Sequence, residues 1–182
     1  MTRSAVTHLT IEHALLGFVA AGATHGYEIY QQLSIPTGLW QVWRVKQSQL
    51  YALLTKVEEL GYLTTTLQPQ EARPPRKIYA LTPRGEAAFQ AWLTTPVANG
   101  RQMRLEFLAK LYFAQRQGPP YVDQLLRRQI EACRQWLTTF QRQEADQTAD
   151  YFAYAVQQFR LNQVDSFLTW LTTCQAARID VQ

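Results

Sequence analysis

The sequence contains few residues of the kinds that bind metals or form disulfides. Its 182 residues include two cysteines, Cys133 and Cys174, and three histidines. The cysteines are far apart without a CxxC pair, and the histidines are not clustered, so neither a zinc site nor a disulfide framework is indicated. We therefore expect two free thiols in helices, no metal site and no cofactor.

Residue patterns typical of enzymes are missing as well. There is no Ser-His-Asp arrangement, no glycine-rich phosphate loop and no pair of carboxylates at a useful spacing. His8, His13 and His25 have no acidic partner at ligand spacing. We expect His25 to cap a helix or to pack against one, and the sequence predicts a protein that is not an enzyme.

Long apolar segments are also absent. No run of 18 or more apolar residues occurs, and the N-terminus does not have the charged, apolar and small-residue regions of a secretory signal. We expect a cytoplasmic protein without a membrane partner. Its length allows one large or two small domains with a hydrophobic core that needs no disulfide.

Acidic residues are missing from two windows of the chain. The formal net charge is only +4, from 18 basic and 14 acidic side chains, but residues 29–57 and 72–85 contain no acidic residue. The basic residues of these windows are Arg44, Lys46, Lys56, Arg73, Arg76, Lys77 and Arg84. Because a solvated surface normally mixes charges of both signs, the two windows favour a nucleic-acid partner.

Hydrophobic spacing predicts three helices in the first third of the chain. Residues 10–22 and 27–33 each place apolar side chains on one face, and Pro36 and Gly38 separate them from the third helix. Gly61 lies where a C-terminal capping glycine of the third helix belongs. The buried face of this helix is predicted to contain Leu50, Leu53, Leu54, Val57 and Leu60.

A two-strand ribbon and a fourth helix are predicted next. Residues 62–67 and 77–81 carry β-branched and aromatic side chains, and the three prolines between them indicate that the connection is a loop. These prolines are Pro69, Pro74 and Pro75. Thr82 and Pro83 are typical of a helix N-cap and first helical position. The expected order is helix, helix, helix, strand, strand, helix.

The remainder of the chain is predicted to be helical and to form a second domain. Residues 94–100 contain proline, asparagine and glycine without hydrophobic periodicity, so we place a boundary here, between domains 1–95 and 96–182. Further breaks are expected at residues 118–120 and 148–150. The middle helix, residues 121–147, has apolar residues three and four positions apart.

The last helix, from Asp150 onward, has two apolar stripes and is the predicted dimerisation element. One stripe contains Phe152, Val156, Phe159, Phe167 and Trp170, and the other contains Leu161, Val164, Leu168 and Leu171. A helix with so wide an apolar surface buries more than one flank. We expect the second stripe to meet another copy of the chain, and the interface to contain Phe152, Val156, Phe159, Leu161, Val164, Phe167, Leu168 and Leu171.

A helix with a polar exposed face followed by a basic ribbon is how a winged helix-turn-helix meets DNA. The helix enters the major groove and the ribbon contacts the backbone beside it. Glutamine can pair with adenine, and lysine can reach guanine or phosphate. Tyr51 could donate to a phosphate or pack under the helix. The candidate DNA-binding residues are Lys46, Ser48, Gln49, Tyr51, Ala52, Lys56, Arg73, Arg76 and Lys77; a solvated helix face and a solvated loop are the alternatives.

Three segments resemble the signature blocks of PadR-family transcriptional regulators. They are HGYEIYQQL (25–33), WRVKQSQLYALLTKVEELGYL (43–63) and RPPRKIYALTPRG (73–85), in the family's order and spacing. RLEFLAKLYFA (104–114) resembles the start of the helical domain in longer members. Family members often have a proline after the tyrosine of the recognition helix. Here Ala52 takes that place, and we expect a more regular helix.

The resemblance implies a mainly α protein, with an N-terminal winged helix-turn-helix followed by an α-helical dimerisation domain. It further implies a homodimeric repressor that binds an inverted repeat in double-stranded DNA. Some members of the family receive aromatic molecules, and the five tryptophans would suit a small aromatic effector, with core packing as the alternative. Another hypothesis is a winged-helix adaptor whose basic ribbon binds an acidic protein surface.

Overall fold

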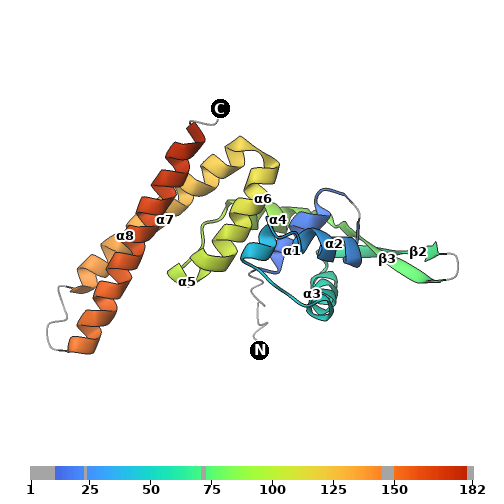
Figure 1. The fold of residues 1–182 in the computed structure, drawn as a ribbon, viewed down its shortest axis with the longest axis horizontal. Coiled ribbons are helices and arrows are strands. Elements are labelled where there is room, and N and C mark those ends of the chain that lie inside the picture. The colour runs from blue at the N-terminus through green and yellow to red at the C-terminus, as the bar shows by residue number, and fades with distance from the viewer. Residues whose placement is uncertain (1–10, 23, 71–72, 145–149, 180–182) are drawn as a thin grey trace, which may run out of the picture. The chain divides into compact units, whose positions relative to one another are not determined.

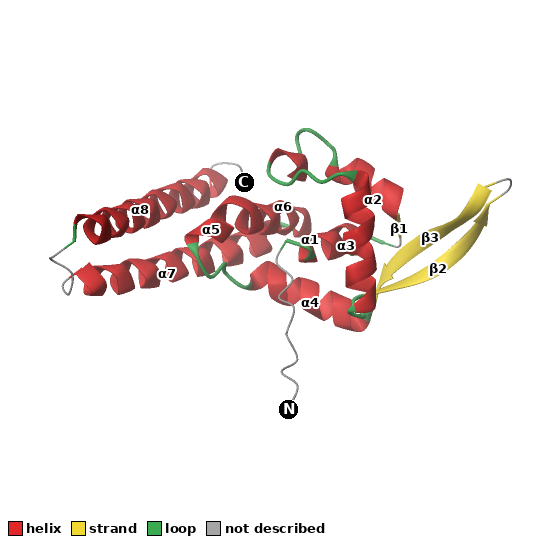
Figure 2. Cartoon of the chain, turned by 90° about the horizontal axis from the view of Figure 1, so that it is seen from below, coloured by secondary structure: helices red, strands yellow, loops and turns green. Residues whose placement is uncertain are grey.

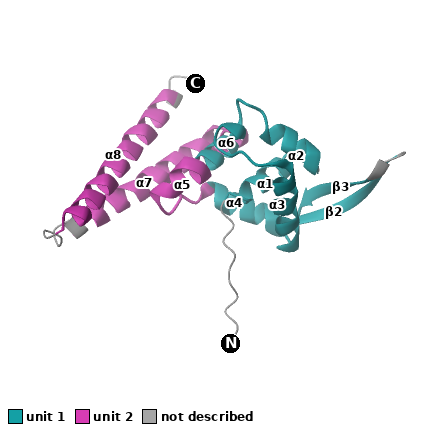
Figure 3. Ribbon diagram, turned by 60° about the horizontal axis from the view of Figure 1, so that its bottom comes forward, with its two compact units in different colours: residues 1–93, 108–113 teal, residues 94–107, 114–182 magenta. Residues whose placement is uncertain are grey.

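A computed structural model describes residues 11–22, 24–70, 73–144 and 150–179 of the chain. The chain divides into two compact units, which Figure 3 colours separately. Unit 1 consists of residues 1–93 and 108–113, and unit 2 of residues 94–107 and 114–182. Residues 108–113 thus belong to unit 1 although they follow the first residues of unit 2 in sequence.

Unit 1 is a winged helix-turn-helix (Figure 1). Its helices are α1 (His13–Val19), α2 (Gly26–Leu33), α3 (Gln47–Glu59), α4 (Pro83–Thr94) and the first part of α6 (Leu108–Gln117). Its other elements are strands β1 (Thr24–His25), β2 (Leu63–Gln70) and β3 (Arg73–Leu81), and the 3-10 turn η1 (Leu39–Gln41). The predicted helices and ribbon are confirmed, whereas β1 and η1 were not predicted.

Apolar faces of the helices form the core of unit 1. Leu50, Leu54 and Val57 of α3 are fully buried, as the spacing predicted. The ring of Phe113, from α6, meets those of Phe18 and Phe89 edge-on, with centroid distances of 5.1 and 5.8 Å. Such edge-to-face pairs are favourable beyond the area they bury, and they explain why residues 108–113 belong to this unit.

The end of α3 is fixed to the start of α4. Gly61 has a φ of +73° and ends α3, as predicted, because glycine adopts this left-handed conformation without steric cost. The Thr82 hydroxyl donates to the carbonyl of Gly61 at 2.8 Å and accepts the Gly85 N–H at 3.0 Å. Thr82 therefore caps α4 while it binds the turn that leads from α3 into β2.

The strands form an antiparallel sheet in the order β1-β3-β2, and β2 and β3 project from it as a ribbon (Figure 2). Both strands are longer than predicted, since Pro69 lies in β2 and Pro74 and Pro75 lie in β3. The expectation that these prolines belong to a loop was wrong. Pro69 lies where the register of the β2–β3 pair shifts. Strand β1 pairs with Ile78 and Tyr79, so Pro74 and Pro75 lie in a part of β3 that, among the described strands, has β2 alone as its neighbour. Each proline thus avoids a regular central position in the sheet.

Unit 2 is helical, and the break between α6 and α7 lies at Gly118, where the sequence predicted one. The other predicted break, at residues 148–150, lies largely outside the described residues. Its elements are α5 (Gly100–Gln102), the π-helical turn η2 (Met103–Phe107), the rest of α6, α7 (Pro119–Glu144) and α8 (Tyr151–Ile179). Helices α7 and α8 pack side by side (Figure 1). The Asp150 carboxylate caps α8 by accepting the N–H groups of Phe152 and Ala153. None of the described helices combines the length and apolar composition needed to cross a membrane.

The two apolar stripes of α8 have different surroundings. Val164 and Leu171 are buried within the single chain, and Leu161 and Leu168 are half-buried. The other stripe is more open, with 73% of Phe152 and 64% of Phe159 exposed. The expectation that the second stripe is left for a partner is therefore wrong for Val164 and Leu171, because packing within unit 2 already covers them. Leu161 and Leu168 keep part of their surface exposed.

Candidate nucleic-acid interface

The polar face of α3 is exposed, opposite the buried leucines. Ser48, Gln49, Tyr51 and Ala52 all lie on this face, and Lys46 is exposed just before the helix begins. Position 50 points into the core while positions 48, 49, 51 and 52 do not, as the helical period requires. The structure thus brings five predicted DNA-binding residues together on one surface of unit 1.

Gln49 has a structural role that was not predicted from the sequence. Its side-chain Oε1 accepts the backbone N–H of Lys46 at 2.9 Å. A glutamine at the third position of a helix commonly satisfies the N-cap N–H in this way, so the spacing alone could have revealed it. The side-chain Oε1 of Gln49 is therefore engaged by Lys46. The side-chain NH₂ group of Gln49 remains available to donate to a base.

Lys56 lies at the edge of this surface and is ion-paired. Its Nζ is 3.0 Å from Oε1 of Glu12, whose side chain is only 14% exposed. The pair joins the last turns of α3 to the residue that precedes α1. The sequence placed Lys56 among the residues that face DNA, whereas the structure directs its ammonium group to an acidic partner 44 residues away.

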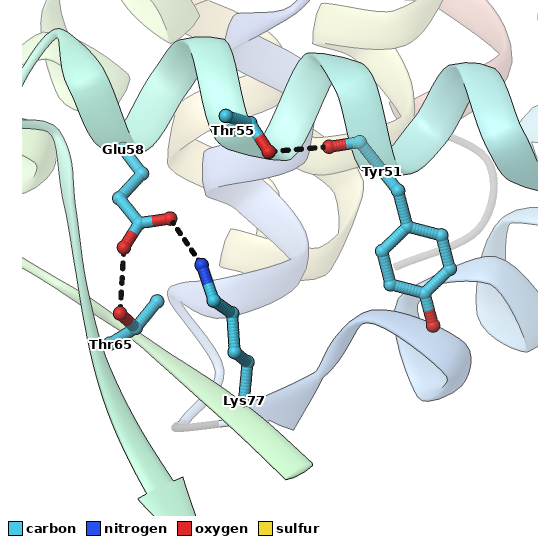
Figure 4. A network of polar contacts seen from close by, with 5 residues as sticks. All are labelled: Tyr51, Thr55, Glu58, Thr65 and Lys77. Carbon is cyan, nitrogen blue, oxygen red and sulfur yellow. Dashed lines mark hydrogen bonds and ion pairs between the residues drawn. The ribbon is translucent and has the colours of Figure 1, made fainter. Parts of the chain in front are cut away.

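A second acidic residue, Glu58, joins α3 to both strands of the ribbon (Figure 4). The Thr65 hydroxyl donates to Oε1 of Glu58 at 2.6 Å, and Nζ of Lys77 donates to Oε2 at 3.3 Å. The hydrogen bond from Thr65, followed by the hydrogen bond and charge of Lys77, lowers the pKa of Glu58, although desolvation opposes them. Lys77, a predicted phosphate contact, is thus held against α3.

Arg76 is an exposed cation of the ribbon, next to Lys77 in β3. Its backbone pairs with Gln68 across the ribbon, and within the described part of the chain no acidic side chain forms a salt bridge with it. The side chain of Arg73, another predicted contact, lies outside the described residues. The guanidinium of Arg76 is therefore available to bind an anionic partner. The ammonium group of Lys77 can bind such a partner only in competition with Glu58.

A groove of about 610 Å³ lies between the start of α2, helix α3 and strand β3. It is lined by His25, Gly26, Tyr27, Tyr51, Pro75, Arg76, Lys77 and Tyr79. Nδ1 of His25 accepts the Glu28 N–H at 3.2 Å, which confirms the predicted capping role. Neither Tyr27 nor Tyr79 was predicted as a site residue. Tyr79 belongs to β3 itself, and only the fold brings Tyr27 beside the ribbon. Burial, followed by the charges of Glu58 and Tyr51, raises the pKa of Tyr79.

This arrangement defines a class of protein, since a helix-turn-helix with an exposed polar recognition helix and a basic wing is a DNA-binding module. Residues 15–91 match the model of the transcriptional regulator PadR-like family, and residues 103–177 match the model described as virulence activator alpha C-term. The chain belongs to the PadR-like family of transcriptional regulators. Transcriptional regulation is a non-enzymatic role.

One curated relative spans nearly the whole chain. It is the negative transcriptional regulator PadR of Bacillus subtilis (strain 168), which is 26% identical over 176 residues and is matched over 91% of this chain and 96% of its own. Crystal structures of Bacillus subtilis PadR in complex with operator DNA and with p-coumaric acid are each 24% identical. The operator complex covers 92% of this chain and 98% of its own, with a TM-score of 0.46. The p-coumaric acid complex covers 92% of this chain and 97% of its own, with a TM-score of 0.41.

Proposed function

We propose that this protein is a homodimeric repressor that binds an inverted-repeat operator. Helix α3 of each protomer reads one half-site in the major groove, while the β2–β3 ribbon contacts the adjoining backbone. The observation that carries the proposal is the exposed polar face of α3 beside a ribbon that presents Arg76. Repression, rather than activation, is supported by the description of the Bacillus subtilis relative as a negative regulator.

The residues on α3 have the chemistry that base reading needs. The amide of Gln49 and the hydroxyl of Ser48 can hydrogen-bond to base edges, and the methyl group of Ala52 can contact a thymine methyl. Lys46 and Arg76 can pair with phosphates, and so can Arg73. Lys56 and Lys77 would have to leave Glu12 and Glu58 to do the same, so we assign them a secondary contribution to DNA binding.

The dimer interface that we propose uses the outer stripe of α8. Phe152 and Phe159 are mostly exposed, and so are the neighbouring Tyr151 and Tyr154. Contiguous exposed apolar surface of this kind marks interaction sites in soluble proteins. A second copy of α8 would cover it, with Val156 and Phe167 contributing, and Leu161 and Leu168 would border the interface.

We extend the proposal to an effector and to a location. The Bacillus subtilis relative has been crystallised with p-coumaric acid, and we propose that a small aromatic molecule likewise relieves repression by this chain. A repressor works in the compartment that holds its operator, which supports a cytoplasmic location. We propose no catalytic activity.

Selection from a pool of random-sequence duplexes tests this function. The full-length protein should enrich a single inverted repeat, and its affinity for that repeat should fall steeply as salt rises, because each phosphate contact releases counterions. An adaptor with a basic ribbon could bind duplexes weakly and in a salt-dependent way, but it would enrich no sequence. A pool that stays random after repeated selection would refute the proposal in favour of the adaptor.

A further inference from the structure

The groove between α2, α3 and β3 combines cationic and neutral hydrogen-bond donors. Arg76 and Lys77 supply positive charge from the ribbon, while Tyr27 and Tyr51 bring phenolic hydroxyls from the two helices. Its volume of about 610 Å³ is within the range of ligand-binding pockets, roughly 300–1,000 Å³. No acidic residue lines it, so the groove is chemically suited to an anion.

Two described acidic residues of the elements that line the groove, Glu28 and Glu58, are engaged elsewhere. Glu28, in the first turn of α2, accepts a hydrogen bond from the Thr24 hydroxyl at 2.5 Å. Glu58 accepts hydrogen bonds from Thr65 and Lys77. These contacts occupy the carboxylates that could otherwise neutralise an arginine, and they leave Arg76 without a salt bridge in the described part of the chain.

Two tyrosines are held at the groove with large exposed surfaces. Tyr27 is 51% exposed and its ring stacks on His25, with centroids 6.5 Å apart and an interplanar angle of 18°. Tyr51 is 39% exposed, and its ring lies so close to Gly26 that a Cβ there would be 2.6 Å from a ring carbon. The absence of a side chain at position 26 therefore lets the Tyr51 ring rest on the start of α2.

We propose that this groove binds one backbone phosphate of the DNA duplex, with the hydroxyls of Tyr27 and Tyr51 and the guanidinium of Arg76 as its ligands. The inference rests on the proposed function, because Tyr51 is on the helix that reads the bases, three residues after Ser48. A phosphate here would fix the register of α3 in the major groove, since backbone contacts position a reader without specifying sequence. Tyr27 thereby becomes a DNA-binding residue outside both the recognition helix and the ribbon.

The test pairs protein variants with chemically modified DNA. The probe is a duplex that the full-length protein has itself selected from a random pool, prepared with a neutral methylphosphonate at one backbone position at a time. For the wild-type protein, one position in each half-site should weaken binding about tenfold, as expected for a lost hydrogen bond to a charged group. Tyr27→Phe should weaken binding to the unmodified duplex to a similar degree.

The decisive readout is the coupling between the two changes. At the position that the groove binds, the methylphosphonate should cost Tyr27→Phe much less affinity than it costs the wild type, and Arg76→Ala should behave in the same way. The matched controls are Tyr30→Phe, on the same helix but outside the groove, and Arg101→Ala, an exposed arginine of unit 2. Both controls should retain the full methylphosphonate effect.

Three results would overturn the inference. The first is Tyr27→Phe binding like the wild type, and the second is strictly additive losses at every modified position. The third is displacement of the duplex by inorganic phosphate far more effectively than by chloride at equal ionic strength, which would assign the groove to free phosphate. A failure to select any duplex would instead refute the proposed function, so the two failures are distinguishable.

Discussion

Single residues on the proposed DNA-binding surface have partners that the sequence did not reveal. Exposure of Ser48, Gln49, Tyr51 and Ala52 could be predicted, because it depends only on the helical period. The ion pairs of Lys56 and Lys77 could not, since their acidic partners are 44 and 19 residues away and meet them only through tertiary packing. Acid-free windows in the sequence are therefore not acid-free surfaces in the fold.

Thr65→Val should raise the pKa of Glu58, because it removes the hydrogen bond that contributes most to the lowering. A carboxyl whose pKa is lower in the folded than in the unfolded state stabilises the fold at neutral pH, and this contribution is lost as the pH falls through the folded-state pKa. The variant should thus have a lower free energy of unfolding than the wild type near neutral pH. In acid, the free energies of unfolding of the two proteins should converge.

NMR titration of the side-chain carboxyl carbon of Glu58 measures the pKa of Glu58 directly. Urea unfolding across the same pH range measures the free energy of unfolding. Thr66→Val is the matched control, since Thr66 is the exposed neighbour on the same strand. An unchanged Glu58 titration in Thr65→Val, or an equal shift in the control, would show that the Thr65 hydrogen bond does not set this pKa.

Lys56→Met and Glu12→Gln should each lower the free energy of unfolding by about 1 kcal/mol, since the pair is partly shielded from water. The double variant should lose less free energy of unfolding than the sum of the losses in the two single variants, because each single variant already removes the same ion pair. Urea unfolding of the three variants completes the cycle. Strictly additive losses would mean that the two side chains do not stabilise each other.

At the scale of elements, the sequence predicted the helices well and the strand lengths poorly. Helix α3 and its terminating Gly61 followed from apolar spacing and from glycine's freedom to adopt a positive φ. The ribbon was predicted too short because prolines are usually excluded from strands. Here Pro69 lies at a register shift, and Pro74 and Pro75 lie in the part of β3 that does not pair with β1. Both features depend on how the strands pair, and no local sequence pattern encodes that pairing.

The N-terminal turn of α3 allows the two roles of Gln49 to be separated. Gln49→Glu keeps an oxygen that can accept the Lys46 N–H, so its unfolding midpoint should stay near that of the wild type, whereas Gln49→Ala should lose about 1 kcal/mol of stability. Both should bind the selected duplex at least tenfold more weakly, the first through repulsion of phosphates and the second through a lost base contact.

Thermal unfolding and fluorescence anisotropy of the two Gln49 variants provide the measurements. Ser48→Ala serves as a control that leaves the cap intact. Wild-type affinity in Gln49→Ala would show that Gln49 caps the helix without contacting DNA.

At the scale of the whole molecule, the sequence predicted two apolar stripes on α8 but could not tell which one faces outward. That choice depends on how α7 and α8 pack, and the structure buries Val164 and Leu171 while it exposes Phe152 and Phe159. The predicted helical second half and the winged helix are both present. Assembly is therefore a question about the Phe152 side of α8.

Phe152→Glu combined with Phe159→Glu should convert the proposed dimer into a folded monomer, because carboxylates cannot be buried there without a partner. Leu171→Glu should instead unfold the chain, since this side chain is fully buried in the monomer. Analytical ultracentrifugation with circular dichroism separates the two outcomes. A Phe152→Glu, Phe159→Glu protein that still sediments as a folded dimer would place the interface on another surface.

The most direct test of DNA reading by α3 compares the full-length protein on its selected duplex and on a scrambled duplex of the same composition at increasing salt. We predict that the selected duplex binds roughly a thousandfold or more tightly than the scrambled one, and that both affinities fall steeply with salt because phosphate contacts release counterions. Equal affinity for the two duplexes, or binding that does not respond to salt, would contradict the account.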